Sequence, residues 1–244
     1  KFTPCVFRRD QVVVTVHGDD FTMTGPIEEL KRTEEDIKKT FDVKVQSLTP
    51  SDVGDEMIIL NRRVVVTTDG YAYEPDGKHT NKVLAELGLD VVGSKGSAIT
   101  GAKTTNDDED LKGRKLDSQK SSWFRSVAAT LNYMSVDRPD LGFAVKELCR
   151  SMSSPSELDL QKLKKIGRYL LEVGNTRMVF VWNADLKRVH GYSDSDVTGG
   201  EKRTSTSGGV IMFGGAVIKC WSKQQKVVAL SSGEAELYGA VKLG

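Results

Sequence analysis

The chain has 244 residues, with 35 Lys and Arg against 34 Asp and Glu and a formal net charge of +1. This balance excludes a global attraction to nucleic acid or to an anionic membrane, so binding of either kind would depend on local patches. No apolar run approaches the ~20 residues of a membrane span. The three cysteines, Cys5, Cys149 and Cys220, form neither a CxxC pair nor a disulfide framework. We therefore expect an intracellular protein of the cytoplasm or nucleus that does not associate with membranes.

The first ninety residues predict short strands and two helices. Two β-rich runs flank His17-Gly18-Asp19-Asp20, which indicates a hairpin. A helix is expected after Pro26, where proline suits a first helical turn. Further strands are expected over 57–60, 64–67 and 71–73, followed by a short helix over 82–87 that Gly88 would end.

Residues 91–122 predict a linker, because glycines punctuate them, an acidic run occupies 107–110 and hydrophobic periodicity is absent. Three helices are then expected within 123–174 from apolar residues at helical spacing. We expect Asp137 to cap the second helix. Ser154 with Glu157 should form a capping box at the start of the third, with Pro155 at the first helical position.

The last seventy residues return to strand patterns and finish with a helix. Strands are expected over 178–182 and 190–193, and a hairpin over 208–221 turns at Gly214-Gly215. Ser231 and Glu234 predict a capping box for a helix that runs to the last residue. The succession of strands and helices predicts an α+β fold.

Asp19 and Asp20 are the first candidate metal ligands. Adjacent carboxylates at a tight turn repel one another, and a divalent cation can reverse that repulsion into attraction. An ordinary solvated turn remains open as the alternative, since Asp and Gly are common turn residues.

Asp194 and Glu236 are the second candidate pair. Asp194 is expected on a strand and Glu236 in the first turns of the closing helix, where an inward carboxylate is costly unless it is paired or bound to metal. Asp196 should face the same side of the strand as Asp194. The alternative is a set of solvated acids on a hairpin rim and at a helix start.

A basic face on the third helix of 123–174 is the candidate nucleic-acid contact. It consists of Lys162, Lys164, Lys165 and Arg168. Each such side chain could neutralise a backbone phosphate and add salt-dependent affinity. A merely solvated face stays open as the alternative.

Three blocks taken together resemble the Pol polyprotein of copia-type LTR retrotransposons. Residues 16–25, Val-His-Gly-Asp-Asp-Phe-Thr-Met-Thr-Gly, resemble the Tyr-Val-Asp-Asp block of reverse transcriptase. Residues 124–145, which include Phe-Arg-Ser, Leu-Asn-Tyr and Arg-Pro-Asp, resemble the segment that joins polymerase to nuclease. Residues 191–236, with Tyr-Ser-Asp-Ser-Asp, Trp-Ser-Lys-Gln-Gln-Lys and Leu-Ser-Ser-Gly-Glu-Ala-Glu, resemble the opening half of RNase H. The chain departs from the family pattern at His17, at Gly18 and over 197–200.

The resemblance implies an α+β chain of four parts. Residues 1–90 would belong to the reverse transcriptase palm and following segment, within a partial palm/thumb region, and 91–122 would be a linker. Residues 123–174 would be a helical connection. Residues 175–244 would be the N-terminal half of an RNase H-like domain, a truncated mixed sheet with a helix.

The resemblance also implies two Mg²⁺ sites that act by phosphoryl transfer on an RNA–DNA hybrid or template-primer. Asp19 and Asp20 would be polymerase carboxylates that face deoxynucleotide triphosphates, and Asp194 and Glu236 would be nuclease carboxylates. Both sets are expected to be incomplete in this chain, so the isolated chain should be an inactive fragment. The alternative is a non-catalytic nucleic-acid-binding remnant or a decayed element without activity. The sequence does not indicate the oligomeric state.

Overall fold

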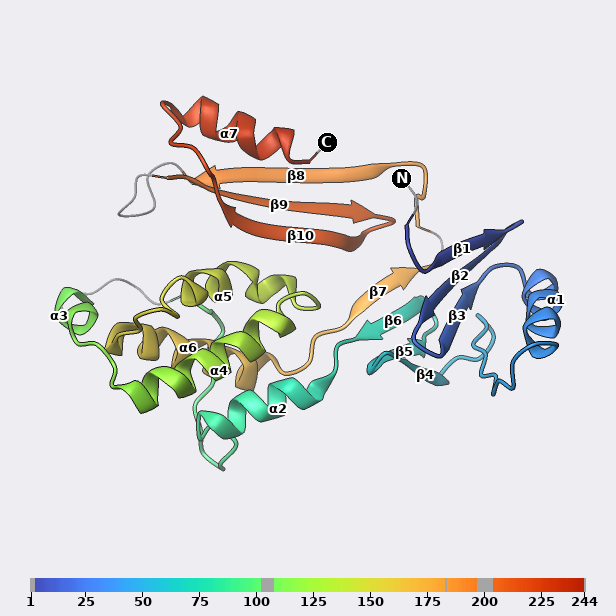
Figure 1. The fold of residues 1–244 in the computed structure, drawn as a ribbon, viewed down its shortest axis with the longest axis horizontal. Coiled ribbons are helices and arrows are strands. Elements are labelled where there is room, and N and C mark those ends of the chain that lie inside the picture. The colour runs from blue at the N-terminus through green and yellow to red at the C-terminus, as the bar shows by residue number, and fades with distance from the viewer. Residues whose placement is uncertain (1–2, 102–107, 183, 197–203, 244) are drawn as a thin grey trace. The chain divides into compact units, whose positions relative to one another are not determined.

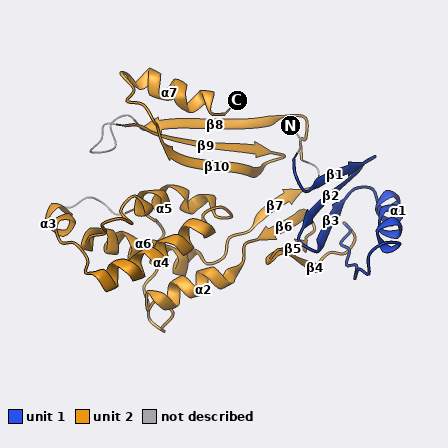
Figure 2. Ribbon diagram, in the orientation of Figure 1, with its two compact units in different colours: residues 1–49 blue, residues 50–244 orange. Residues whose placement is uncertain are grey.

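The computed structural model describes residues 3–101, 108–182, 184–196 and 204–243 (Figure 1). The chain divides into two compact units, residues 1–49 and 50–244 (Figure 2). Within the described residues there are three antiparallel sheets and seven α-helices, which confirms the α+β class. No helix in these ranges is long and apolar enough to cross a membrane. The predicted departure from the family pattern over 197–200 lies outside the described residues.

The first unit is a three-stranded sheet followed by a helix. Its strands, in the order β1-β2-β3, are β1 (Val6–Arg9), β2 (Val12–His17) and β3 (Asp20–Thr24), and its helix is α1 (Ile27–Lys38). The predicted hairpin and helix are confirmed. Alternation along β2 buries Val12 and Val14. Strand β1 was not predicted, because three of its four residues are exposed and its sequence carries no alternating pattern.

A four-stranded sheet in the second unit brings together segments far apart in the chain. Its order is β4 (Glu56–Ile59), β5 (Arg62–Val66), β6 (Gly70–Glu74) and β7 (Met178–Val181). Gly70 pairs with Val181, and a Cβ at Gly70 would lie 2.0 Å from the carbonyl oxygen of Phe180. Glycine therefore permits this close approach of β6 and β7. The sequence predicts β7 as a strand, but not that it pairs with β6; the domain boundaries implied by resemblance stay predictions.

The helical part of the second unit surrounds an apolar core. Its elements are α2 (Gly77–Glu86), α3 (Asp108–Gly113), α4 (Ser118–Met134), the 3₁₀ turn η1 (Pro139–Leu141), α5 (Gly142–Cys149) and α6 (Glu157–Val173). Apolar residues at helical spacing on these elements are buried together. The core residues are Val83, Phe124, Val127, Ala128, Leu131, Met134, Leu141, Val145, Leu148, Leu163, Ile166 and Leu170.

Three local predictions in this helical part were wrong in detail. The N-cap of α6 is Ser156, which forms its capping box with Asp159, so Pro155 precedes the helix instead of opening it. Asp137 caps no helix, because its carboxylate pairs with Arg62. The predicted linker contains α3 and the start of α4. In the first two cases, a neighbouring serine supplied the cap or a side-chain ion pair engaged the expected capping residue.

The last part of the second unit is a three-stranded sheet with a helix along it (Figure 1). Its order is β10 (Ala216–Gln224), β9 (Thr206–Phe213) and β8 (Val189–Asp196), and α7 (Ser232–Val241) follows. The hairpin about Gly214-Gly215 is confirmed, and both glycines have positive φ. The described sheet is antiparallel throughout, whereas the resemblance implies a mixed sheet. Helix α7 ends at Val241 rather than at the last residue.

Candidate functional site

The first carboxylate pair lies on the hairpin of the first unit. His17 pairs with Asp20 across a two-residue turn formed by Gly18 and Asp19. Gly18 has φ +64°, which a glycine adopts without strain at the first central position of a II′ turn. The side chains of Asp19 and Asp20 are both exposed. The turn therefore presents two adjacent carboxylates to solvent.

The second pair lies where α7 meets the edge of its sheet. Strand β8 is at the edge of the sheet, and Asp194 pairs with Gly208 of β9. The carboxylate of Glu236 on α7 accepts a hydrogen bond from the backbone amide of Ser195, with an N···O distance of 3.2 Å. Glu236 therefore lies beside the strand position that follows Asp194.

Strand alternation places the two carboxylates differently with respect to the sheet. A Cβ built on Gly239 of α7 would lie 3.8 Å from the side chain of Ser193, so Ser193 faces α7. Successive side chains of a strand point to opposite faces, which puts Asp194 and Asp196 on the face away from α7. Both aspartates are exposed. Glu236 instead reaches the open edge of β8.

A magnesium ion needs about six oxygen ligands, which water and a few carboxylates can supply together. In residues 3–101, 108–182, 184–196 and 204–243, no three His, Cys, Asp or Glu side chains gather closely enough to hold a metal ion. Glu236 is also engaged by the Ser195 amide. The described acids of this chain therefore do not by themselves fit a two-metal site.

Gln225 fixes α7 to the sheet and was missed by sequence reasoning. Its side-chain nitrogen donates to Ser207 Oγ at 2.8 Å and to the carbonyl oxygen of Ala235 at 2.9 Å. Its backbone amide donates to the carbonyl oxygen of Ser205. One side chain thus bridges β9 and the first turn of α7. No local pattern marks it, because both partners come from other elements.

The predicted basic face lies on the solvent side of α6. Lys162, Lys164 and Arg168 are exposed, and Lys165 is half-buried. The inward side of the same helix carries Leu163, Ile166 and Leu170. Within the part of the chain that the structure describes, none of the four basic side chains forms an ion pair. Their charge is therefore available to an external anion.

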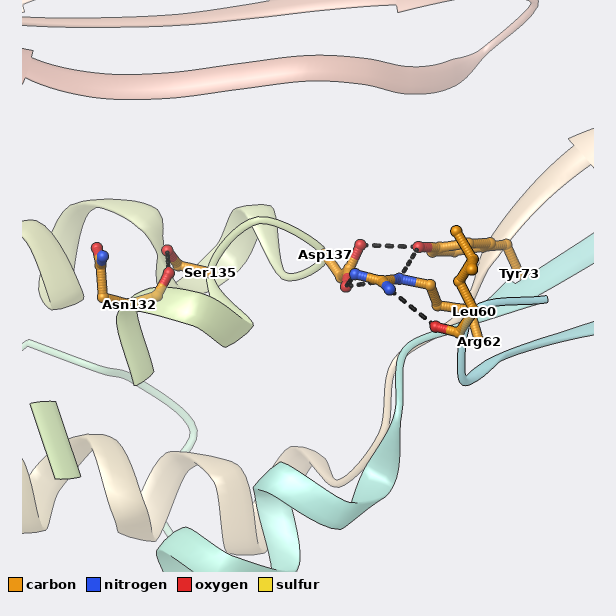
Figure 3. Close-up of polar contacts among 6 residues, drawn as sticks. All are labelled: Leu60, Arg62, Tyr73, Asn132, Ser135 and Asp137. Carbon is orange, nitrogen blue, oxygen red and sulfur yellow. Dashed lines mark hydrogen bonds and ion pairs between the residues drawn. The ribbon is translucent and has the colours of Figure 1, made fainter. Parts of the chain in front are cut away.

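A polar network that the sequence did not reveal joins the four-stranded sheet to the helices (Figure 3). Arg62 donates to Asp137 at 2.9 Å and to the hydroxyl of Tyr73 at 3.1 Å, and that hydroxyl donates to Asp137 at 2.7 Å. Burial raises the pKa of Tyr73, and the bond to Asp137 raises it further. Arg62 also donates to the carbonyl oxygen of Leu60, a turn residue with φ +48°. The network secures this strained turn.

A buried arginine, Arg138, orders the end of α6. Its side chain is 1% exposed and donates to the carbonyl oxygen of Gly174 and to the carboxylate of Asp140. Burial acts to raise the pKa of Asp140, but the hydrogen bonds and charge of Arg138, together with Tyr169, outweigh it and lower the pKa. This pair is structural, since it lies within the helical part and touches neither carboxylate pair.

Curated proteins with similar sequences include Pol polyproteins of plant transposons. The chain is 38% identical to the retrovirus-related Pol polyprotein from transposon RE1 of Arabidopsis thaliana over 114 residues, which is 46% of this chain and 8% of that protein. It is 26% identical to the corresponding polyprotein from transposon TNT 1-94 of Nicotiana tabacum over 254 aligned residues, 99% of this chain and 18% of that protein. The chain thus spans less than a fifth of the length of these relatives.

Other comparisons add a shorter relative. The chain is 38% identical over 115 residues to a protein named secreted RxLR effector protein 161 of Plasmopara viticola, covering 47% of this chain and 80% of that protein. No family model matches, and no solved structure matches. The matches to the transposon proteins confirm the resemblance to retrotransposon Pol polyproteins, while the assignment of the three blocks to reverse transcriptase and RNase H stays a prediction. Homologues of this chain therefore include retrovirus-related Pol polyproteins of plant transposons.

Proposed function

We propose that the chain is a segment of the reverse transcriptase and RNase H region of a retrotransposon Pol polyprotein, and that it binds an RNA–DNA hybrid or template-primer. The observation that carries the proposal is the similarity to one transposon Pol polyprotein, that of TNT 1-94, along 99% of the chain. The unpaired basic face of α6 supports it, because exposed Lys and Arg side chains neutralise phosphates. Deoxynucleotide triphosphates would be ligands of the longer polymerase.

Magnesium-dependent phosphoryl transfer belongs, in this proposal, to a longer polyprotein chain. Asp19 and Asp20 are accessible on their turn, and Glu236 lies beside the residue after Asp194. The described residues nevertheless gather no group of three metal ligands. We derive no metal-dependent step from this chain, and the isolated chain should bind the hybrid without cleaving it.

The lack of a group of three metal ligands among the described residues favours a second candidate function, a non-catalytic nucleic-acid-binding remnant. Two separated carboxylate pairs retain negative charge without the ligand number that magnesium chemistry requires. The two candidates agree about binding by the 244-residue chain. They differ in whether a longer polyprotein that contains this segment turns over its substrate.

Binding is tested by titrating the full chain with labelled RNA–DNA hybrid at two salt concentrations in EDTA. The test variant is Lys164→Gln/Arg168→Gln, and the control is Lys78→Gln/Lys82→Gln, which removes two exposed lysines at the same spacing on α2. We expect affinity to fall about tenfold in the test variant and to change little in the control. Equal affinity in both variants would show that the basic face of α6 does not contact the hybrid.

Turnover is tested in a longer polyprotein chain that includes the flanking sequence. With Mg²⁺ present, we expect hybrid cleavage that Asp194→Asn or Glu236→Gln abolishes, and DNA synthesis that Asp19→Asn abolishes. Full activity in one of these variants would refute the role of that residue. Binding without any turnover would favour the remnant.

A further inference from the structure

Strand β10 presents two lysines and a tryptophan on one face of its sheet. Lys219, Trp221 and Lys223 lie two positions apart along the strand, so their side chains point the same way. A β-bulge at Ile218 shifts the register, after which Trp221 pairs with Gly209 of β9. The bulge matters because it determines which β10 side chains share a face with Gly209.

This face is the one that α7 covers. Ser193 of β8 pairs with Gly209 and faces Gly239 of α7. A Cβ on Gly209 would lie 2.2 Å from the Trp221 ring, so the indole lies directly over that glycine. Trp221, Ser193 and α7 are therefore on the same side of the sheet, opposite to Asp194.

A third lysine joins the group from the end of α7. The ammonium of Lys242 lies 5.3 Å from the centre of the Trp221 ring, and that of Lys219 lies 5.7 Å from it. Partial burial lowers the pKa of Lys242, and the charges of Lys223 and Lys219 lower it further. Three positive charges from two elements thus repel one another around a single aromatic ring.

Lys219, Lys223 and Lys242 form a lysine cluster around the Trp221 ring. Among the described residues, none of the three forms an ion pair. The indole N–H of Trp221 is buried and likewise has no hydrogen-bond partner in the described ranges. Mutual repulsion without compensation is unfavourable, and an external anion would relieve it. The ring fixes two of the ammonium groups by cation–π contacts, which reduces the entropy lost when an anion binds.

We propose that the lysine cluster binds the phosphodiester backbone of a nucleic acid on the α7 side of the sheet. Lysine ammonium groups serve as point charges for phosphates, and three of them suit a ligand that carries repeated negative charge. The proposal rests on the proposed function for the identity of the nucleic acid. It adds a second contact surface, formed by β10 and α7, to the basic face of α6.

Binding of a fluorescein-labelled RNA–DNA hybrid to the full chain, in EDTA and across a series of salt concentrations, tests the proposal. The test variant is Lys219→Gln/Lys223→Gln and the matched control is Lys78→Gln/Lys82→Gln, each of which removes two positive charges. We expect the test variant to bind about tenfold more weakly and to lower the slope of log affinity against log salt by about 2. Replacing both lysines by arginine should preserve the slope.

The arms of the experiment separate this inference from the proposed function. If the hybrid binds and only the α6 variant weakens it, the lysine cluster is not a contact and the proposed function stands. If binding depends on the lysine cluster while a longer chain cleaves no hybrid, the inference is supported and the proposed catalytic role of the longer chain is refuted. If poly-glutamate displaces hybrid better than polyphosphate of equal charge does, the cluster recognises an acidic protein and the proposal is overturned. Absence of binding at low salt overturns both.

Discussion

The helices α4, α5 and α6 differ from the sheet β8–β10 in whether their buried side-chain polar atoms have hydrogen-bond partners. The helical core is apolar, and Phe124, Leu131 and Leu148 are fully buried in it. In the sheet, by contrast, strand β8 is mostly exposed and α7 packs through small residues such as Ala235 and Gly239. Within the described ranges, the four buried side-chain polar atoms that lack a hydrogen-bond partner all belong to this sheet and its flank: those of Ser195, Trp221, Ser222 and Gln225.

The difference indicates that dense apolar packing and unpartnered polar atoms lie in different parts of the second unit. Dense apolar packing contributes most of the folding free energy, while orphaned polar atoms reduce it. Proteins retain such costs mainly at functional sites. The sheet with α7 carries Asp194, Glu236 and the lysine cluster, which agrees with this expectation. Substitutions in the helical core should therefore affect unfolding strongly, and those in the sheet should affect it less.

The largest effect is expected for Phe124→Ala. Its side chain is 0% exposed in the helical core, so truncation removes apolar burial and leaves a cavity. We expect the free energy of unfolding to fall by about 3–5 kcal/mol, measured by urea titration with circular dichroism. Leu237→Ala on α7, where the residue is 61% exposed, serves as the control and should change it by less than about 0.5 kcal/mol. Similar losses of unfolding free energy in Phe124→Ala and Leu237→Ala would show that the helical core does not contribute more to stability than the exposed face of α7.

The next effect is expected for Asp140→Asn. This change leaves the guanidinium of Arg138, which is 1% exposed, without its counter-charge, although the bond to Gly174 remains. Unpairing a buried charge should lower stability by about 3 kcal/mol. Asp110→Asn removes an exposed ion pair with Arg114 and should cost less than about 1 kcal/mol. Equal costs would show that burial of Arg138 does not matter.

The Asp140 contribution should also depend on pH. Its pKa is lowered in the folded chain, chiefly by Arg138 acting against burial. A carboxyl whose pKa is lower in the folded state than in the unfolded state stabilises the fold at any pH above its unfolded pKa of about 3.9. That stabilisation is lost as the pH falls through its folded-state pKa. The difference in unfolding free energy between the wild type and Asp140→Asn should have its maximum value at about pH 7 and should decrease below about pH 4. A difference in unfolding free energy that increases as the pH is lowered would contradict this prediction.

A smaller effect is expected for Gly209→Ala, which tests the packing of Trp221. The new Cβ would lie 2.2 Å from the indole, so the ring must move. Overpacking of this kind costs about 1–3 kcal/mol and should change the tryptophan emission. Gly208→Ala is the matched control, because the nearest atoms to its Cβ are 4.0 Å away. An unchanged emission in Gly209→Ala would show that the ring does not rest on this glycine.

Local pattern predicted most of the helices and the hairpins at Gly18-Asp19 and Gly214-Gly215, but it missed β1 and α3. Five apolar residues at helical spacing on α4 are all buried, because a 3.6-residue period reports the face that packs: Phe124, Val127, Ala128, Leu131 and Met134. The α6 cap was misplaced by two residues, since Ser154 and Ser156 both precede an acid at the required spacing. The pairing of β7 with β6 could not be predicted, because about 100 residues separate them and no local signal encodes strand partners.

The candidate site was predictable only in its carboxylates and basic helix face. Asp-Asp turns and Lys-rich helix faces are visible as strings, whereas Gln225 acts through two partners on other elements. The lysine cluster was missed for the same reason, since Lys242 meets Lys219 and Lys223 only after α7 packs on the sheet. A resemblance to Pol blocks identified residues, but it could not show on which face of β8 each carboxylate lies.

The smallest effect is expected for Glu236→Ala, which tests the bond between α7 and the edge of β8. The variant loses one acceptor for the Ser195 amide, whose N···O distance is 3.2 Å, and should cost about 1 kcal/mol. Amide hydrogen exchange at Ser195 should become about fivefold faster, since the loss corresponds to less than one decade in an equilibrium constant. Glu234→Ala removes the acceptor of the Leu230 amide instead and should leave Ser195 unchanged. Unaltered exchange at Ser195 in Glu236→Ala would mean that this carboxylate does not join α7 to β8.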